Sequence, residues 1–251
     1  MFLMWILFLF VISAQGQDNA PPGDADTKYA TNFIANRHWP DGKIKYWILP
    51  TGNSASWLIP KVIDGLDFLS NETDYAVVFE KPAPLDGSMG MCGLTEWTYY
   101  PLIIVYVGNR CKKGLLTHEI MHALGFEHEF TRRDRSKYVT INCDNIRAGR
   151  EVQFDVCYDC VYTKDPSWKV FQDFDYSSVT MYSSKALGEK NTETITPKDP
   201  AKKELMGKYQ LSESDIERLK FVYGKNYKKP EQVNEAIKNL EYCPAKEIEM
   251  K

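Results

Sequence analysis

Residues 118–129 read HEIMHALGFEHE, and this stretch decides how the rest of the chain is interpreted. On an α-helix, residues four positions apart share a face, so His118 and His122 can point at one metal ion. Glu119 would then lie beside that ion. The spacing therefore predicts a helix that carries two metal ligands and an acid–base group.

A third histidine completes the predicted site. Gly125 is expected to end the helix, because glycine readily adopts the left-handed backbone found at helix ends. The chain can then turn and bring His128 to the same ion, and three protein ligands leave one position open, as in catalytic zinc sites. The alternative is that these histidines belong to an ordinary helix. The pattern HExxHxxGxxH holds three of the four histidines of the chain, which argues against chance.

The composition limits the classes of function. A chain of 251 residues holds one sizeable domain or two small lobes, and its net charge of −3 gives no indication of nucleic acid or an anionic membrane as a partner. Residues 1–16, MFLMWILFLFVISAQG, fit a secretory signal cleaved after Gly16. A membrane anchor is the alternative, but about twelve apolar residues are too few to span a bilayer.

A secreted chain with six cysteines is expected to form three disulfides. Asn71 begins an Asn-Glu-Thr sequon and is a candidate glycosylation site on the secretory route. Residues 17–30 are polar and rich in Pro, Gly and Asp, which predicts a mobile leader rather than part of a core.

Periodicity predicts a mixture of strands and helices. Strands are expected in KIKYWIL after Arg37, at 75–80 and at 102–107, and helices at 54–69, 113–124, 212–223 and 231–240. Residues 131–200 are expected to be largely irregular.

With these segments in view, the chain resembles the astacin family of metzincin metalloproteases from about Arg37 to about Tyr227. Besides the zinc motif, the resemblance rests on HWPDGKIKY, EFTRRDRSKYVTINCDNI, FDYSSVTMY, ETITPKDP and LSESDIERLKFVYG. Glu129 directly after His128 is typical of astacins among the metzincins. The resemblance implies a two-lobed α+β fold, with a twisted sheet and the zinc helix in the upper lobe and a mostly irregular lower lobe. The cleft between the lobes would take an extended peptide.

The resemblance also implies catalytic roles. A zinc ion held by three neutral imidazoles lowers the pKa of bound water, and Glu119 can accept that proton and pass it to the leaving amine. Tyr182 matches the Met-turn tyrosine of astacins, which is similar to a fifth zinc ligand that swings away to support the oxyanion. In FDYSSVTMY, Thr180 stands where astacins usually have methionine. We expect either a hydroxyl beneath the zinc site or a turn rearranged so that Met181 fills that place, with activity retained.

Further expectations concern maturation and specificity. The astacin glutamate that matches Glu129 contacts the buried amino terminus of the mature enzyme, which would start near Ala30; an exposed acid at the helix end is the alternative. Astacin leaders often inhibit through an aspartate in a FxGD pattern, so Asp24 in PPGDAD is either that latency ligand or a polar leader residue. Lys208 aligns with a basic residue of the first primed subsite, which would favour Asp or Glu after the cut bond; otherwise it is a surface lysine.

The resemblance pairs Cys92 with Cys111, just before the zinc helix. A second common astacin bridge is missing, because Asp74 and Tyr227 stand near its two positions. The remaining cysteines allow three pairings, which the sequence does not distinguish; they are Cys143, Cys157, Cys160 and Cys243. The CxxC motif among them favours a structural disulfide over a redox or metal role in a secreted chain.

We therefore predict a secreted zinc endopeptidase of the astacin type, a monomer with one catalytic Zn²⁺. Its partners would be protein or peptide substrates, with no nucleic acid and no stable membrane association. The alternatives are an inactive zinc-bearing binding module on the same fold and a membrane-tethered protease. The predicted segments are a signal peptide (1–16), a short pro-segment (17–29), the catalytic domain (30–228) and a partly helical tail (229–251).

Overall fold

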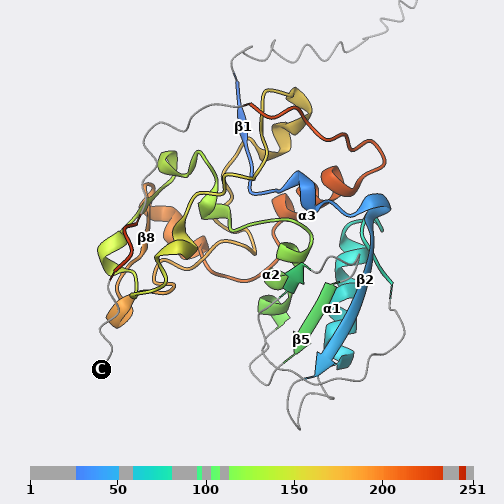
Figure 1. Ribbon diagram of the computed structural model, residues 1–251, viewed down its shortest axis with the longest axis horizontal. Coiled ribbons are helices and arrows are strands. Elements are labelled where there is room, and N and C mark those ends of the chain that lie inside the picture. Colours follow the sequence, from blue (N-terminus) through green and yellow to red (C-terminus); the bar gives the residue numbers. More distant parts are fainter. Residues whose placement is uncertain are drawn as a thin grey trace, which may run out of the picture.

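The computed structural model of the protein describes residues 27–50, 59–80, 95–97, 103–107, 113–233 and 243–246. The predicted signal peptide, most of the predicted pro-segment, Asp24, Cys92 and Cys111 lie outside these residues. So do residues 234–242 of the helix predicted at 231–240. Figure 1 shows the described chain in two parts, one built on a sheet with helices and the other largely irregular. This arrangement confirms the predicted α+β class.

The sheet has four strands in the order β3-β2-β5-β4. The central pair, β2 (Lys43–Pro50) and β5 (Ile103–Val107), is parallel, as are β2 and β3 (Val78–Glu80), whereas β4 (Thr95–Trp97) runs antiparallel to β5. In β2, Ile44 and Tyr46 are buried while the lysines between them are exposed, which is the alternation expected of a strand with one covered face.

Two helices pack against each other and against the edges of this sheet. Helix α1 (Ile59–Glu72) contacts β3, and α2 (Lys113–Ala123) contacts β4. The buried face of α1 carries Val62, Leu66 and Leu69, at the three- and four-residue spacing of an amphipathic helix. Helix α2 is the predicted zinc helix. In Figure 1 both helices lie beside β2 and β5.

The third α-helix, α3 (Glu213–Tyr223), begins at the predicted cap. The Ser212 hydroxyl accepts the Asp215 N–H, and the Asp215 carboxylate accepts the Ser212 N–H, so the two residues form a capping box. The helix buries Leu219 and Val222 in the first core. Sequence pattern and structure agree here because both ends of the cap are local.

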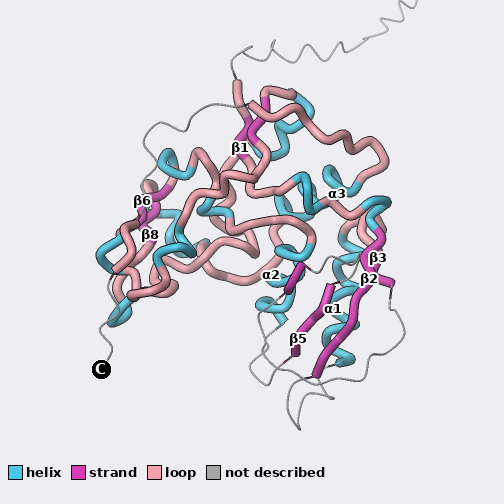
Figure 2. The backbone as a smooth tube through the Cα atoms, in the orientation of Figure 1, coloured by secondary structure: helices cyan, strands magenta, loops and turns pink. Residues whose placement is uncertain are grey.

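Residues 131–200 are largely irregular, as predicted, and Figure 2 shows mostly loop in this part. Two short antiparallel sheets fasten it, β1 (Tyr29–Ala30) with β7 (Tyr162–Thr163) and β6 (Val139–Ile141) with β8 (Ile195–Pro197). The short 3₁₀ helices of the described chain are Ala35–Arg37, Pro40–Gly42, Glu129–Thr131, Arg135–Lys137, Cys143–Asn145, Glu151–Phe154, Pro166–Phe171, Glu189–Asn191 and Pro200–Leu205.

Two hydrophobic cores match the two parts. The first joins the sheet, α1, α2 and α3, with Phe33 and Trp168 fully buried in it. The second lies in the irregular part around Phe130, Phe154 and Met181. The chain crosses from one core to the other between Phe126 and Phe130, which is where the third histidine of the zinc motif lies.

The structure pairs the cysteines that the sequence left open. Cys143 bonds to Cys243 across 100 residues, and Cys157 bonds to Cys160 within the CxxC motif. The first bridge fastens the C-terminal tail to the irregular part of the fold. The second confirms the expected structural disulfide.

Candidate metal centre

Helix α2 and the turn that ends it position the three histidines. The Gly125 N–H donates to the carbonyl of His122 and the Phe126 N–H to that of Met121, which together form a Schellman motif. Gly125 has a φ of +88°, as predicted for the residue that ends the helix. A side chain there would also lie only 3.1–3.3 Å from Phe33, Arg37 and Ile34. The turn leads the chain back to place His128 beside the helix.

One ring nitrogen from each of His118, His122 and His128 lies within 4.8 Å of the others. His118 Nδ1 is 2.7 Å from the carbonyl oxygen of Val179, and His122 Nδ1 is 2.7 Å from that of Phe126. A carbonyl oxygen only accepts, so each Nδ1 carries the proton and donates it. Each neutral ring therefore has its lone pair on Nε2.

These two Nε2 atoms are 3.1 Å apart. Two lone pairs at this distance repel each other, and a cation bound by both removes the repulsion. In a tetrahedral zinc site with Zn–N bonds near 2.05 Å, the ligand nitrogens lie about 3.4 Å apart. The donor set and its spacing therefore fit a zinc ion held by His118, His122 and His128.

Burial keeps the three imidazoles neutral. It lowers the pKa of His118 to about 4, with a further contribution from His122. Burial also lowers the pKa of His122, and it holds the pKa of His128 well below the ordinary value. Neutral imidazole is the form that binds metal, so the site is prepared for a cation without losing protons.

Glu119 lies on the same helix, and its side chain is partly buried. Burial raises its pKa to about 7. A nearby dication would favour the ionised form and bring this pKa down again. A carboxyl with a pKa in this range is suited to accept and return a proton near neutral pH.

Two tyrosines line the histidines. The Tyr182 ring centroid is 4.2 Å from that of His128, and burial raises the pKa of Tyr182 to about 12. The Tyr209 ring lies 5.5 Å from His118, and its pKa is raised by burial and by the charge of Glu119. Sequence reasoning missed Tyr209, because its place depends on a left-handed backbone at φ +51° and on close packing against Gly114.

The turn at Ser178–Met181 answers the expectation about the altered methionine position. Met181 is fully buried in the second core with Phe130. Thr180 is also fully buried, and its hydroxyl contacts Asn32 and Ser178. The hydroxyl alternative is therefore the one that the structure adopts.

Glu129 is fully buried, which excludes the alternative of an exposed acid at the helix end. Its Oε1 accepts from Arg132 Nη1 at 2.9 Å and from the Asp175 N–H at 2.9 Å, and its Oε2 accepts from Arg218 Nη1 at 2.8 Å. Both carboxylate oxygens are thus bound within the fold. Contact with a mature amino terminus stays a prediction.

Most of this chain matches a known family of peptidases. The family model Astacin, which describes that peptidase family, matches residues 33–224, more than half of the chain. The chain belongs to the astacin family. This membership places the domain among the zinc metalloendopeptidases and confirms the resemblance noted in the sequence.

This astacin is 38% identical over 111 residues to zinc metalloproteinase nas-14 of Caenorhabditis elegans, covering 44% of this chain and 21% of that protein. It is 37% identical over 191 residues to zinc metalloproteinase nas-15 of the same organism, covering 72% and 32%. The chain thus spans a third or less of these two relatives. The structure of High choriolytic enzyme 1, a hatching enzyme zinc-protease from Oryzias latipes, is similar with a TM-score of 0.56 and 22% identity, covering 75% and 95% of the two chains. At this identity the likeness shows the fold alone.

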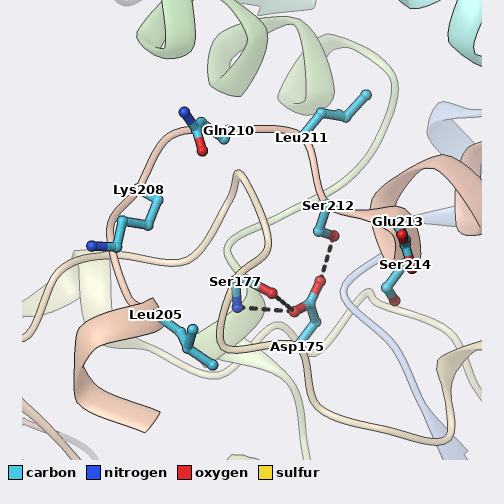
Figure 3. A pocket seen from close by; sticks show the side chains of 9 residues that line it. All are labelled: Asp175, Ser177, Leu205, Lys208, Gln210, Leu211, Ser212, Glu213 and Ser214. Carbon is cyan, nitrogen blue, oxygen red and sulfur yellow. Dashed lines mark hydrogen bonds between the residues drawn. The ribbon is translucent and has the colours of Figure 1, made fainter.

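Two of the predicted site residues of this astacin lie at its surface. Lys208 is exposed at the rim of a pocket of about 560 Å³, next in sequence to Tyr209. Figure 3 shows it on the segment that leads from Leu205 to the start of α3. Asn71 is exposed in the last turn of α1. Among the described residues, no helix is long and apolar enough to cross a membrane.

Proposed function

We propose that this astacin is a secreted zinc-dependent endopeptidase that hydrolyses peptide bonds in proteins. The observation that carries the proposal is the pair of imidazole lone pairs 3.1 Å apart, both fixed by carbonyl groups, with Glu119 on the same helix. This arrangement has little use except to bind a cation beside a carboxylate. Zinc bound there would polarise the scissile carbonyl and make a water molecule acidic.

The protein side chains divide the remaining work. Glu119 would accept a proton from the attacking water and deliver it to the leaving amine, as a carboxyl with a pKa near neutrality can do. Tyr182, whose raised pKa keeps it protonated, would donate its hydroxyl hydrogen to the oxyanion that develops on the carbonyl. His118, His122 and His128 would only hold the metal.

Several finer assignments belong to the same proposal. Lys208, at the pocket rim next to Tyr209, would favour an acidic residue directly after the cut bond. Residues 1–16 would direct secretion, Asn71 would carry a glycan, and removal of the segment up to about Ala30 would complete maturation. Asp24 as a latency ligand and a bond between Cys92 and Cys111 complete this proposal.

Glutamate 119 provides the direct test. Glu119→Gln keeps the shape of the side chain but cannot take a proton, so casein cleavage should fall at least a hundredfold while zinc content stays at one ion per chain. Glu204→Gln is the matched control, because Glu204 is an exposed glutamate of a 3₁₀ helix and should keep full activity.

Other outcomes discriminate between the two candidate functions. A wild-type protein that binds zinc but cleaves neither casein nor gelatin would favour the inactive binding module. Cleavage that persists in Glu119→Gln would remove the proposed general base.

A further inference from the structure

Four buried polar side chains form one hydrogen-bonded chain beside the zinc histidines. Asn32, Ser178, Thr180 and Asp215 are each 1% exposed or less. Asn32 Nδ2 lies 3.3 Å from Thr180 Oγ1, which lies 3.0 Å from Ser178 Oγ, which lies 2.7 Å from Asp215 Oδ1. These residues come from the N-terminal segment, the turn after the irregular region and α3, so the chain links three distant parts of the sequence.

The ends of this chain fix the direction of every hydrogen bond. The Asn32 amide nitrogen can only donate, and the Asp215 carboxylate is surrounded by donors, since it also accepts the N–H groups of Val179 and Ser212. Ser178 must therefore donate to Asp215, and Thr180 must donate to Ser178. Each hydroxyl is left with a defined orientation.

One end of the chain acts on His118. The peptide group between Val179 and Thr180 accepts the His118 Nδ1 proton at its oxygen and donates its N–H to Ser178 Oγ at 3.2 Å. The Val179 N–H is held by Asp215 at 2.8 Å. The carbonyl that orients His118 therefore cannot rotate without breaking contacts to Ser178 and Asp215.

The other end of the chain acts on His128. The Asn32 amide donates to the carbonyl oxygen of Glu127 at 2.9 Å, and the Glu127 N–H donates to the carbonyl of Asn32. Glu127 directly precedes His128. The loop that carries the third histidine is thus fastened to the same asparagine that holds Thr180.

We propose that Thr180 is a positioning residue of the zinc site, which joins the support of His118 to the support of His128. The hydroxyl takes over a position where astacins usually have methionine, and it replaces apolar packing by a directed hydrogen bond. The proposal rests on the proposed zinc site, but it concerns the precision of the ligands and not the identity of the reaction. Groups that orient metal-binding histidines typically change metal affinity by about 10–100-fold when removed.

The test removes the hydroxyl and then restores it. Thr180→Val keeps the shape of the side chain, and we expect zinc affinity, measured by chelator competition on the full chain, to fall roughly tenfold. The visible spectrum of the Co²⁺-loaded protein should change, and kcat should fall with KM unchanged. Thr180→Ser should restore all three. The matched control is Thr194→Val, which removes a fully buried threonine hydroxyl that donates to the Ala186 carbonyl at 2.7 Å, and zinc affinity should stay at the wild-type value.

The outcomes separate this proposal from the proposed function. Wild-type zinc affinity and Co²⁺ spectrum in Thr180→Val would overturn the positioning role, even if the enzyme is active. Loss of affinity to the same degree in Thr194→Val would also overturn it, because general destabilisation would then explain the effect. If Thr180→Val does not fold, Ser178→Ala interrupts the same chain and must weaken zinc binding. A wild-type protein that binds zinc but cleaves nothing would contradict the proposed function and leave this zinc-affinity test in force.

Discussion

Glu129 and Arg218 form a fully buried ion pair between segments that lie 89 residues apart, with Arg218 Nη1 donating to Glu129 Oε2 at 2.8 Å. Arg132 donates to the other carboxylate oxygen at 2.9 Å. The pair fastens α3 to the 3₁₀ helix that begins directly after His128. It therefore connects the C-terminal helix to the third zinc ligand.

Removal of the Glu129 charge should be costly. Glu129→Gln would leave two buried guanidinium groups without their anion, and breaking such a pair costs about 3–5 kcal/mol. We expect a loss of this size in the free energy of unfolding, measured with urea at pH 7. Glu213→Gln, an exposed acid on the same helix as Arg218, should change it by less than about 0.5 kcal/mol.

The pH dependence of this effect has a definite sign. Burial alone would raise the pKa of Glu129, but the charges of Arg218 and Arg132 outweigh it and hold the pKa below the ordinary 4.5. The stabilisation is thus fully present above pH 4.5 and is lost as the pH falls through the lower pKa of the folded state. Glu129→Gln should therefore lose less stability on acidification than the wild type. Parallel acid-unfolding curves of the two proteins would contradict this assignment.

Zinc affinity should be insensitive to mild acid. Because burial lowers the pKa of His118 to about 4 and lowers those of His122 and His128, protons do not compete with the metal above that pH. Three ordinary histidines with a pKa of 6.5 would lose affinity by roughly several hundredfold between pH 7 and pH 5.5. We expect a loss of less than about tenfold, measured by chelator competition with the pH dependence of the chelator included. A loss near the larger figure would show that the histidines are not held neutral.

Much of this site was predictable from local sequence, because local spacing fixes local geometry. The positions of His118 and His122, the helix end at Gly125 and the Ser212 cap each follow from residues within a few positions of one another. The same holds for the alternation in β2 and for the buried face of α1. In these places no distant part of the chain has to be known.

The contacts that the sequence did not reveal join distant segments. The bond between Cys143 and Cys243 spans 100 residues, and nothing near either cysteine distinguishes it from the other pairings. Thr180 looked like a defect in a familiar turn until Asn32, 148 residues away, supplied its hydrogen-bond donor. Tyr209 reaches the histidines only through a backbone conformation that its sequence does not favour.

Gly125 should not tolerate a side chain. Gly125→Ala would place an L-residue at a φ of +88° with contacts of 3.1–3.3 Å to its neighbours, so we expect a loss of about 1–3 kcal/mol in unfolding free energy and weaker zinc binding. Gly65→Ala is the matched control, since Gly65 lies within α1 and a Cβ there would make an ordinary contact of 3.5 Å with Leu116. That variant should be neutral or stabilised by up to about 1 kcal/mol. Equal losses in both variants would mean that the turn has no special requirement for glycine.

Tyr182 should affect turnover more than binding. Tyr182→Phe keeps the ring that packs 4.2 Å from His128 and 4.8 Å from Phe130, and it removes only the hydroxyl. If that hydroxyl stabilises the oxyanion, its loss should lower kcat by roughly 10²–10³-fold while KM and zinc content stay unchanged. Tyr176→Phe provides the comparison, because the Tyr176 hydroxyl donates to the Tyr138 carbonyl at 2.8 Å and has no part in the proposed reaction. Equal activity in Tyr182→Phe and the wild type would assign Tyr182 to packing, and the oxyanion donor would then have to be sought at Tyr209, the other tyrosine whose ring faces His118.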